Sequence, residues 1–503
     1  MRSMSKRFIS MSLVIVLAFL GIAGRVGYIM LSGSYGVSES YNSYTLVIDK
    51  LVPNLYYRNA GKITNNKFSY IAVIRPNREC LFELNDIYSQ KEKNEITDEL
   101  SKGYPVVYKI DSESRYKANA IQVFRDYYSS NTCPQLINEG SSGLLSYIKD
   151  NSRTKKINFS VDANGRLLAG DSGTVIDDGY SSKSGYALTL DEKLQKILYD
   201  SCADMKNGCA IIMDVKTGGI LACVTKPDSA YTNKALKQCA VGSVFKIIVA
   251  ACALENNVDI KFNCTGKITV GDTTYSCQNN HIHAQQGLRE ALANSCNCYF
   301  VNLSLELGYN KILKTARALG FSDTTNLFEN WNISNASLPT EEVLKSKGQL
   351  ALLGFGQGTL TSTPVQICSA LCTIADSGYK NDIRLVESSV DDNGVYTPYR
   401  MKAPQQVISK STCDKILSYL RYVVTNGTGG RAENSKKKSA GKTATAQTGQ
   451  YAFGKEILNT WFAGVYPFDK PEYAIVIMTE QGKSGSEDCC PVYRRVVEKI
   501  SDL

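Results

Sequence analysis

Residues 185–503 of this sequence predict an α+β fold, in which one antiparallel sheet is backed by helices. The first observation is that apolar runs of strand length lie near both ends of this range, at Gly208–Asp214 and Thr460–Tyr466. The second is that helical patterns dominate the sequence between them, including a long apolar stretch at Val244–Glu255. Strands that enclose a run of helices favour a layer of helices against a single sheet.

The first elements of this range follow from the spacing of its apolar residues. Tyr186–Leu190 is strand-like, and Asp191–Asp200 carries leucine and isoleucine at helical spacing. Gly208–Asp214 and Gly219–Thr225 are two apolar runs separated by a Lys-Thr-Gly-Gly turn, which predicts a β-hairpin.

The last elements close the domain. Helical patterns continue to about Tyr422, and Gly441–Thr445 predicts a strand edge. Thr460–Tyr466 and Tyr473–Thr479 predict two further strands, and Val492–Ile500 predicts a closing helix.

Residues 34–184 predict a separate domain. The sequence here is polar, rich in Tyr and Asn, and only weakly periodic. Short strand-like runs occur at Tyr70–Ile74 and Val106–Ile110, and the stretch near Ala118–Tyr128 is predicted to be helical. No motif in this region carries chemistry, so we expect it to be non-catalytic.

The N-terminal residues 1–33 predict a cytoplasmic tail and a transmembrane anchor. Phe8–Gly24 follows a basic N-terminus and contains no charge, and apolar character resumes after Arg25 through Leu31. About 24 residues of this kind span a bilayer. Because basic residues stay in the cytoplasm, a single-pass topology places the remainder on the extracytoplasmic face of the cell membrane. A cleaved signal peptide is the alternative, but no persuasive small-x-small cleavage site is present.

Composition narrows the function classes. The formal charge of +9 over 503 residues is modest, and neither zinc-finger spacing nor a basic helix with interleaved aromatics occurs, so nucleic-acid binding is not expected. Only two histidines exist, His281 and His283. A Ser–His–Asp triad would need one of them, and a His-rich metal centre cannot be built, so no cofactor is expected.

Sixteen cysteines are many for this chain, but no C-x-x-C pair occurs among them. Cys296 and Cys298 lack zinc-ribbon spacing, so no metal site is expected. Cys264 and Cys277 bracket a Gly- and Thr-rich stretch typical of a hairpin, and they could form a disulfide outside the cytosol. Buried free thiols are the alternative, and both remain open.

Ser243 and Lys246 form a candidate nucleophile and base. They begin the apolar helix directly after Gly242, and a spacing of three places them on one helical face. The helix is apolar on all sides and therefore buried, and burial lowers the pKa of an ammonium so that it can act as a general base. Backbone N–H groups at the helix N-terminus suit an oxyanion. The tetrapeptide alone is weak evidence, because Ser435–Lys438 matches it too.

Ser295 and Asn297 form a second polar pair, at a junction between a short amphipathic helix and a loop. A hydroxyl and an amide two residues apart can relay a proton and hold a substrate amide. The same pattern occurs at Ser129–Asn131, so on its own it indicates a capping role.

Gly441–Thr445 is the third candidate segment. Its small and β-branched residues predict a strand edge exposed to a cleft, where Lys442 and Thr443 present a cation and a hydroxyl to a carboxylate. On its own the segment is typical of an ordinary strand.

In combination, the three motifs resemble those of the penicillin-binding proteins and serine β-lactamases. Ser-x-x-Lys at Ser243 is followed by Ser-x-Asn at Ser295 and Lys-Thr at Lys442, in the order of that family. Gly354–Gln366, with its Gly-Phe-Gly-Gln-Gly run, supports the resemblance, which is strongest to the monofunctional class B penicillin-binding proteins. It covers the chain from about Gly185 and implies the family's transpeptidase domain at 185–503.

The resemblance implies a peptidoglycan D,D-transpeptidase that cross-links stem peptides through a serine acyl-enzyme and is inhibited by β-lactams. Ser243 would attack the penultimate D-Ala carbonyl while Lys246 takes its proton. Ser295 would relay that proton to the leaving amine, with help from Lys442.

The same resemblance implies the substrate contacts. Asn297 would hold the substrate backbone and Thr443 the terminal carboxylate, and backbone N–H groups of Ser243 and Thr445 would form the oxyanion hole. The family's third motif usually ends in Gly, whereas Ala444 stands there in this chain. We expect this methyl to narrow the cleft or shift β-lactam affinity.

Partners follow from the resemblance as well: stem peptides ending in D-Ala-D-Ala, β-lactams, the membrane and a membrane glycan polymerase. Upstream, Tyr56–Gly61 resembles a degraded form of the family's post-anchor motif, which implies that 34–184 is the non-catalytic pedestal. Two alternatives remain. One is a D,D-carboxypeptidase, β-lactamase or β-lactam sensor on the same fold, and the other is a catalytically silent scaffold for wall assembly.

Overall fold

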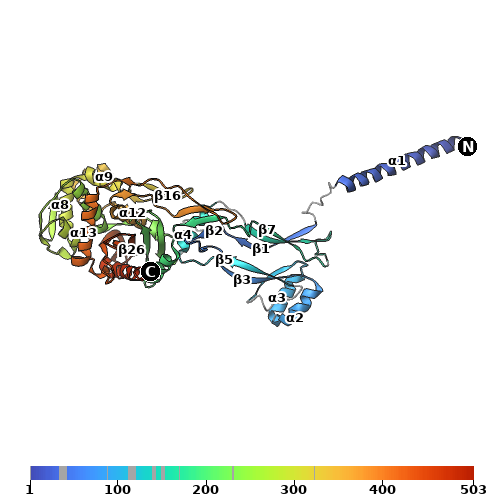
Figure 1. Ribbon diagram of the computed structural model, residues 1–503, viewed down its shortest axis with the longest axis horizontal. Helices are drawn as coiled ribbons and strands as arrows, with labels where there is room; N and C mark the ends of the chain where they lie inside the picture. The colour runs from blue at the N-terminus through green and yellow to red at the C-terminus, as the bar shows by residue number, and fades with distance from the viewer. Residues whose placement is uncertain are drawn as a thin grey trace. The chain divides into compact units, whose positions relative to one another are not determined.

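The computed structural model describes residues 2–32, 42–87, 89–110, 121–138, 143–148, 153–168, 170–228, 231–321 and 323–503 (Figure 1). The chain forms two compact units. Unit 1 comprises Met1–Leu51, Lys67–Tyr128 and Ser152–Ser181, and unit 2 comprises Val52–Asn66, Ser129–Asn151 and Ser182–Leu503. The predicted boundary between anchor and pedestal, at residues 33 and 34, lies outside the described residues.

Unit 2 is built on a five-stranded antiparallel sheet in the order β10-β9-β26-β25-β24. Its strands are β9 (Gly208–Asp214), β10 (Ile220–Lys226), β24 (Ala440–Ala452), β25 (Lys455–Tyr466) and β26 (Tyr473–Glu480). The strands come from the two ends of the predicted domain, as the sequence predicts, and the predicted hairpin is β9–β10. β24, which carries the third motif, is an edge strand of this sheet.

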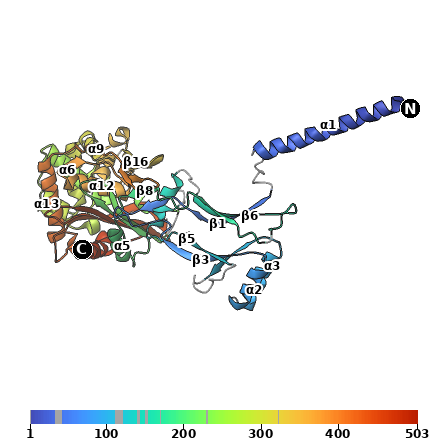
Figure 2. The ribbon, with the colours of Figure 1, turned by 45° about the vertical axis from the view of Figure 1, so that its right-hand side comes forward.

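Eleven α-helices, two of them single turns, lie among the described residues of unit 2, and they gather there in both views (Figures 1 and 2). They are α4 (Pro134–Ile137), α5 (Glu192–Ser201), α6 (Lys246–Glu255), α7 (Leu288–Ala293), α8 (Asn297–Leu307), α9 (Tyr309–Ala318), α10 (Glu341–Leu344), α11 (Lys347–Gly354), α12 (Pro364–Ala375), α13 (Lys410–Asn426) and α14 (Cys490–Ile500).

Helices cover both faces of the five-stranded sheet. In β9, Ile211 and Met213 join the core that contains α12, whereas Ala210 and Ile212 join the core that contains α5 and α14. Successive side chains of a strand point to opposite faces, so burial on both sides requires a continuous apolar run. This explains why β9 and β26 are apolar throughout rather than alternating.

The other strands of unit 2 form small sheets. The predicted strand at Tyr186–Leu190 belongs to one of these and not to the five-stranded sheet. The small sheets consist of β2 (Asn54–Tyr56), β8 (Gly185–Leu188), β21 (Val386–Val390) and β22 (Tyr396–Pro398); β11 (Cys239–Ala240), β19 (Thr361–Ser362) and β18 (Ala336–Ser337); β12 (Phe262–Cys264) and β15 (Ala284–Gln286); β13 (Lys267–Val270) and β14 (Thr273–Ser276); β16 (Thr324–Phe328) and β17 (Trp331–Ser334); β20 (Tyr379–Lys380) and β23 (Gln405–Gln406).

The described residues of unit 1 form two three-stranded antiparallel sheets and three helices. One sheet has the order β1 (Ser43–Leu51), β6 (Arg153–Ser160), β7 (Thr174–Asp178), and the other has the order β4 (Val106–Ile110), β3 (Lys67–Ile74), β5 (Gln122–Tyr128). The helices are α1 (Arg2–Ser32), α2 (Arg78–Ile87) and α3 (Gln90–Leu100). The two predicted strands of this region are β3 and β4.

The predicted helix near Ala118–Tyr128 is wrong. Residues 118–120 lie outside the described part, and the rest forms β5, which pairs with β3 along its length. β5 is rich in Val, Phe and Tyr, which favour a pleated surface over a helix. Phe68 of β3 contacts Tyr127 and Arg125 across the pair, at 5.6 Å between ring centroids and 4.5 Å from the guanidinium carbon to the ring centroid.

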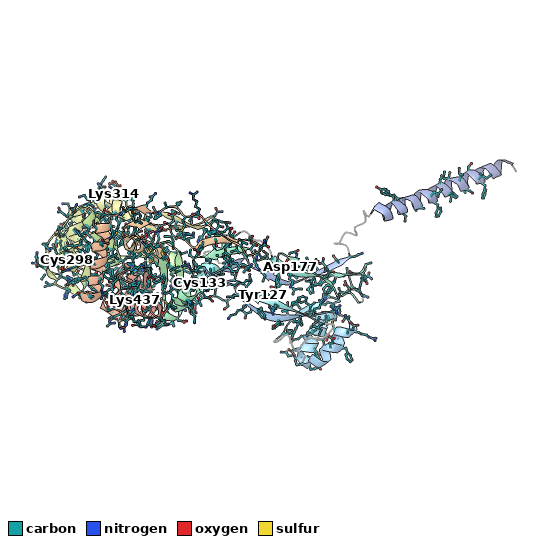
Figure 3. The ribbon with its side chains drawn as sticks, viewed as in Figure 1. Tyr127, Cys133, Asp177, Cys298, Lys314 and Lys437 are labelled. Atoms are coloured by element: carbon teal, nitrogen blue, oxygen red, sulfur yellow. The ribbon has the colours of Figure 1, made fainter. Side chains whose placement is uncertain are left out.

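α1 contains the predicted anchor. Its segment Phe8–Tyr28 has a mean hydropathy of 2.2 and is long and apolar enough to cross a membrane. The side chains from Phe8 to Leu20 are exposed along the helix (Figure 3). Apolar side chains exposed on every side of a helix suit a lipid environment, so α1 fits a single-pass membrane anchor.

Candidate active site

Ser243 lies in η4 (Gly242–Phe245), a 3-10 turn that leads into α6. The backbone of Gly242 fixes this turn against the sheet: its N–H donates to Gly356 O at 3.0 Å, and a Cβ on Gly242 would lie 2.9 Å from the Cβ of Ala446 in β24. Gly242 also has a φ of 59°, which favours glycine. Ser243 is therefore held one residue from the point where its turn touches β24.

Lys246 is the first residue of α6 and is completely buried. Lys246–Ala253 are all buried, as the apolar character of this helix predicts. The Lys246 amine donates to Ser295 O and to Asn297 Oδ1, both at 2.7 Å, and lies 3.3 Å from Ser295 Oγ. These contacts join the first and second motifs directly.

The turn that carries Ser295 and Asn297 connects α7 to α8 and orients both residues toward the amine. Ser295 has a φ of 53°, which is uncommon for a residue other than glycine and marks a locally strained backbone. Asn297 Nδ2 donates to Ser276 O at 2.9 Å, so its Oδ1 is left to accept from Lys246. The amide orientation is therefore fixed by partners on both sides.

Burial lowers the pKa of Lys246 to about 8, although the neighbouring thiols of Cys296, Cys277 and Cys298 raise it. A neutral amine has two N–H donors and one lone pair. The two 2.7 Å hydrogen bonds use both donors, so the lone pair can accept a hydroxyl proton, and the Ser295 hydroxyl lies 3.3 Å from the amine nitrogen. The geometry therefore suits a general base.

Lys442 lies on β24 and is also completely buried. Its amine donates to Thr443 O at 2.8 Å, and burial together with the charge of Lys246 lowers its pKa well below the usual lysine value. The Thr443 hydroxyl lies 2.5 Å from the hydroxyl of Thr428. Two buried lysines of like charge disfavour simultaneous protonation, which favours a neutral amine at Lys442.

A cleft of about 850 Å³ brings most of the predicted residues together. Six of the eight predicted site residues line it: Ser243, Ser295, Asn297, Thr443, Ala444 and Thr445. Lys246 and Lys442 are not among its lining residues, because their side chains are buried. The hydroxyls and amide thus face the cleft, while both lysines lie beneath its surface.

The cleft also contains residues that sequence reasoning missed. Asn426, Gly427 and Thr428 follow α13, and Ser484–Ser486 precede α14. The backbone N–H of Thr428 donates to Ala293 O at 3.1 Å, which connects this loop to α7. The Asn-Gly-Thr-Gly-Gly run at 426–430 is a typical loop signal, but nothing in it indicates that the loop folds back onto the third motif.

Ala444 projects less into the cleft than its position in the motif predicts. It is 3% exposed, and a Cβ on Gly485 would lie 2.7 Å from Ala444 O. The segment around Gly485 therefore lies against Ala444. The methyl therefore adds little to the cleft surface. Its predicted effect on access to the cleft and on β-lactam affinity stays a prediction.

The cysteines of the described residues are free, including Cys264 and Cys277. Their sulfurs are 3.7 Å apart, which is too far for a disulfide. The structure therefore shows the free-thiol alternative, with a hairpin of β13 and β14 between the two residues. Cys264, Cys277, His283 and Cys296 also form a group that could hold a metal ion.

Comparison with known proteins reveals one matching family. The penicillin binding protein transpeptidase domain matches residues 208–498. Stage V sporulation protein D of Bacillus subtilis is 27% identical over 95% of this chain and 82% of its own length. Penicillin-binding protein PbpB of Mycolicibacterium smegmatis is 28% identical over 62% of this chain, and the match spans 53% of that relative.

Solved structures share the fold. The D,D-transpeptidase domain of a peptidoglycan glycosyltransferase from Eggerthella lenta has a TM-score of 0.65 and 21% identity, covering 90% of this chain and 98% of that structure. Penicillin binding protein 3 of Mycobacterium tuberculosis, in complex with aztreonam, has a TM-score of 0.65 and 19% identity, covering 91% of this chain and 97% of that one.

Proposed function

This chain belongs to the penicillin-binding protein transpeptidase family, and on that premise we propose that Ser243 is the nucleophile of a peptidoglycan D,D-transpeptidase. The match over residues 208–498 confirms the family and the class of enzyme that the sequence predicts. The solved structures confirm the predicted fold class. One observation carries the residue assignment: the buried Lys246 amine is held by the Ser295–Asn297 turn, which shares its cleft with Ser243.

Acylation starts with the neutral Lys246 amine. Ser243 Oγ attacks the carbonyl carbon of the penultimate D-Ala, and its proton passes to the lone pair of Lys246. As the tetrahedral intermediate collapses, the C–N bond breaks and the terminal D-Ala leaves. Its amine takes a proton from the Lys246 ammonium through the Ser295 hydroxyl, which lies 3.3 Å from Nζ.

Lys442 assists the proton relay in this proposal. Its own amine is bound to Thr443 O at 2.8 Å, so it is not placed to donate to a substrate carboxylate in this arrangement. Burial and the charge of Lys246 lower the pKa of Lys442 well below the usual lysine value. The neutral Lys442 amine helps Ser295 to pass the proton from the Lys246 ammonium to the leaving amine.

Substrate contacts come from both walls of the cleft. The Thr443 hydroxyl, which is hydrogen-bonded to the hydroxyl of Thr428, binds the terminal carboxylate. Asn297 binds the peptide backbone of the stem. Backbone N–H groups of Ser243 and Thr445 stabilise the oxyanion, and each such donor contributes about 3 kcal/mol. The tight contact between Gly242 and Ala446 supports this assignment, because it fixes the two N–H groups on adjoining segments.

The stem peptide ending in D-Ala-D-Ala is the first substrate, and β-lactams acylate the same serine. In transpeptidation an amine of a second stem peptide attacks the acyl-enzyme carbonyl, so that a new amide replaces the ester to Ser243. In the alternative enzymes, a D,D-carboxypeptidase or β-lactamase, water performs that attack. A β-lactam sensor would keep the acyl group.

The anchor gives the proposed location. α1 crosses the cell membrane once, and the basic N-terminus stays in the cytoplasm, so the part of unit 1 that follows α1 and the whole of unit 2 lie on the extracytoplasmic face. The division into anchor at 1–33, non-catalytic pedestal at 34–184 and transpeptidase domain at 185–503 stays a prediction. A membrane glycan polymerase is the proposed partner, because cross-linking needs newly made glycan strands close to the membrane.

Product analysis with an amine acceptor tests the reaction. The full chain in detergent is incubated with a synthetic stem peptide ending in D-Ala-D-Ala and an excess of a D-amino acid as acceptor. We expect mass spectrometry to find the acyl group mainly on the acceptor amine, and no product with Ser243→Ala. Hydrolysed peptide alone would favour the carboxypeptidase. Catalytic destruction of β-lactams would favour the β-lactamase, and absence of any acyl-enzyme would favour the scaffold.

A further inference from the structure

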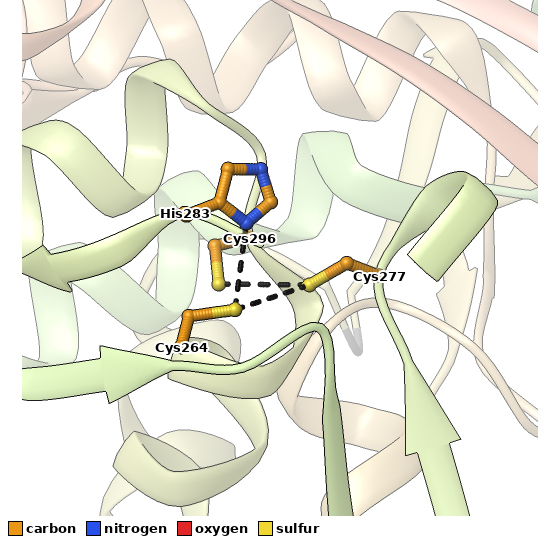
Figure 4. Close-up of side chains that lie close together, drawn as sticks. All are labelled: Cys264, Cys277, His283 and Cys296. Atoms are coloured by element: carbon orange, nitrogen blue, oxygen red, sulfur yellow. Dashed lines mark hydrogen bonds between the residues drawn. The ribbon is translucent and has the colours of Figure 1, made fainter. Parts of the chain in front are cut away.

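Three cysteines and one histidine converge at the edge of the cleft, which Cys277 and His283 line. Figure 4 shows the four side chains pointing toward one another. Cys264 ends β12, Cys277 follows β14, His283 precedes β15, and Cys296 is the N-cap of α8. Their ligating atoms all lie within 4.8 Å of one another, and the three thiols are buried. We propose that these four residues bind one structural Zn²⁺.

Three distances within the group are close to those of a tetrahedral zinc site. The sulfur of Cys277 is 3.7 Å from those of Cys264 and Cys296, and Cys264 Sγ is 3.5 Å from His283 Nδ1. With Zn–S of about 2.3 Å and Zn–N of about 2.0 Å, tetrahedral ligands lie about 3.8 Å apart for two sulfurs and about 3.5 Å for sulfur and nitrogen. Three cysteines and one histidine are also a common structural zinc ligand set.

The same geometry argues against a disulfide. A disulfide joins two sulfurs at about 2.0 Å and leaves the others apart. Here the sulfur of Cys277 has three sulfur neighbours at similar distances, because Cys298 Sγ also lies 3.5 Å away. None of these three sulfurs lies within bonding distance of Cys277 Sγ, so these thiols are not joined in disulfides.

The surroundings favour the protonation states that zinc requires. The backbone N–H groups of Gly266 and Tyr299 donate to the sulfurs of Cys264 and Cys296, both at 3.4 Å, and such donors stabilise thiolates. On binding, the three thiols release three protons, and the filled site carries one net negative charge.

The location of Cys296 gives the metal a positioning role. Cys296 lies between Ser295 and Asn297, the two residues that hold the Lys246 amine. A metal bound to Cys296 and to the segment 264–283 would hold the turn between α7 and α8 against the strands β12, β14 and β15. This role rests on the proposed function, whereas the zinc site itself does not.

Metal content tests the site. The full chain is purified in detergent under reducing conditions without chelators, and elements are measured by mass spectrometry. We expect about one Zn²⁺ per wild-type chain, and background zinc in Cys264→Ser and Cys296→Ser. Cys239→Ser is the matched control, since Cys239 lies on β11 outside the group, and it should retain zinc. Co²⁺ substituted into the wild type should give the intense visible absorption of tetrahedral thiolate coordination, which needs no variant to fold.

Three results would overturn the zinc site: a wild-type chain that neither contains zinc nor takes up Co²⁺, equal zinc loss in Cys239→Ser, or a disulfide between Cys264 and Cys277 in the unreduced chain. The positioning role has its own measurement. Chelator treatment should slow acylation by fluorescent penicillin about 10-fold to 100-fold, with recovery on adding Zn²⁺. A zinc-containing chain that acylates equally fast after zinc removal refutes that role. A zinc-containing chain that never acylates refutes the proposed function and leaves the metal site standing.

Discussion

A Ser243→Ala variant of the full chain is expected to remain unlabelled by fluorescent penicillin, whereas the wild-type chain becomes covalently labelled. The acyl-enzyme is an ester to Ser243 Oγ, and alanine has no atom that can form it. Gel fluorescence and intact-protein mass spectrometry measure the result. Because Ser243 faces the cleft and is only partly buried, the variant should keep the wild-type thermal unfolding transition.

Ser435→Ala is the matched control for this experiment. Ser435 begins the same Ser-x-x-Lys tetrapeptide, but it is exposed, and Lys438 is paired with Asp469 at 3.5 Å instead of being buried. Labelling should be unchanged in this variant. Label that persists in Ser243→Ala would show that a different serine is the nucleophile.

Replacing Lys246 with methionine is expected to slow acylation by about 100-fold to 10,000-fold, the range for loss of a general base. Methionine fills the buried space but cannot accept the Ser243 proton. Ser295 O and Asn297 Oδ1 also lose their 2.7 Å donor, which costs about 1–3 kcal/mol for each unsatisfied group. Stopped-flow acylation by a chromogenic β-lactam measures the rate, and thermal unfolding measures the cost.

Lys438→Met is the corresponding control, because the exposed Lys438 contributes only a surface ion pair. Its acylation rate and unfolding temperature should match those of the wild type. A Lys246→Met variant that acylates at the wild-type rate while correctly folded would exclude Lys246 as the base.

The burial of Lys246 could be predicted from local sequence alone. α6 has apolar residues on every side, and a lysine at its first position has no exposed helical face on which to lie. The contrast with Lys438 shows why the tetrapeptide by itself predicts little. The same four-residue pattern in an exposed loop leaves the amine in water.

The second motif depends on tertiary structure. Ser129–Asn131 has the same pattern as Ser295–Asn297, but Ser129 Oγ accepts from Asn65 N at 3.1 Å and Asn131 Oδ1 accepts from Cys133 N at 3.1 Å. That pair therefore supports the backbone of a loop. Only the packing of the α7–α8 turn against α6 distinguishes the two, and no local spacing encodes that packing.

Neither the proposed metal site nor the strand β5 could be predicted from the sequence, and the reasons are related. The four ligands all lie between residues 264 and 296, but they lack zinc-ribbon spacing. The pairing of β12 with β15 brings Cys264 beside His283, and local sequence does not predict that pairing. In β5, a weak helical pattern is outweighed by pairing with β3. Both cases follow from hydrogen bonds between segments that are distant along the chain, which periodicity does not report.

The pH dependence of acylation is the sharpest measure of a neutral Lys246 amine. The wild-type acylation rate should rise with pH and level off above the Lys246 pKa of about 8, since only the deprotonated amine accepts the Ser243 proton. The titratable groups that face this amine are Lys442, His283 and the thiols of Cys277, Cys296 and Cys298. A rate that is independent of pH, or that keeps rising to the ordinary lysine value of about 10.4, would contradict a buried amine held neutral beside the nucleophile.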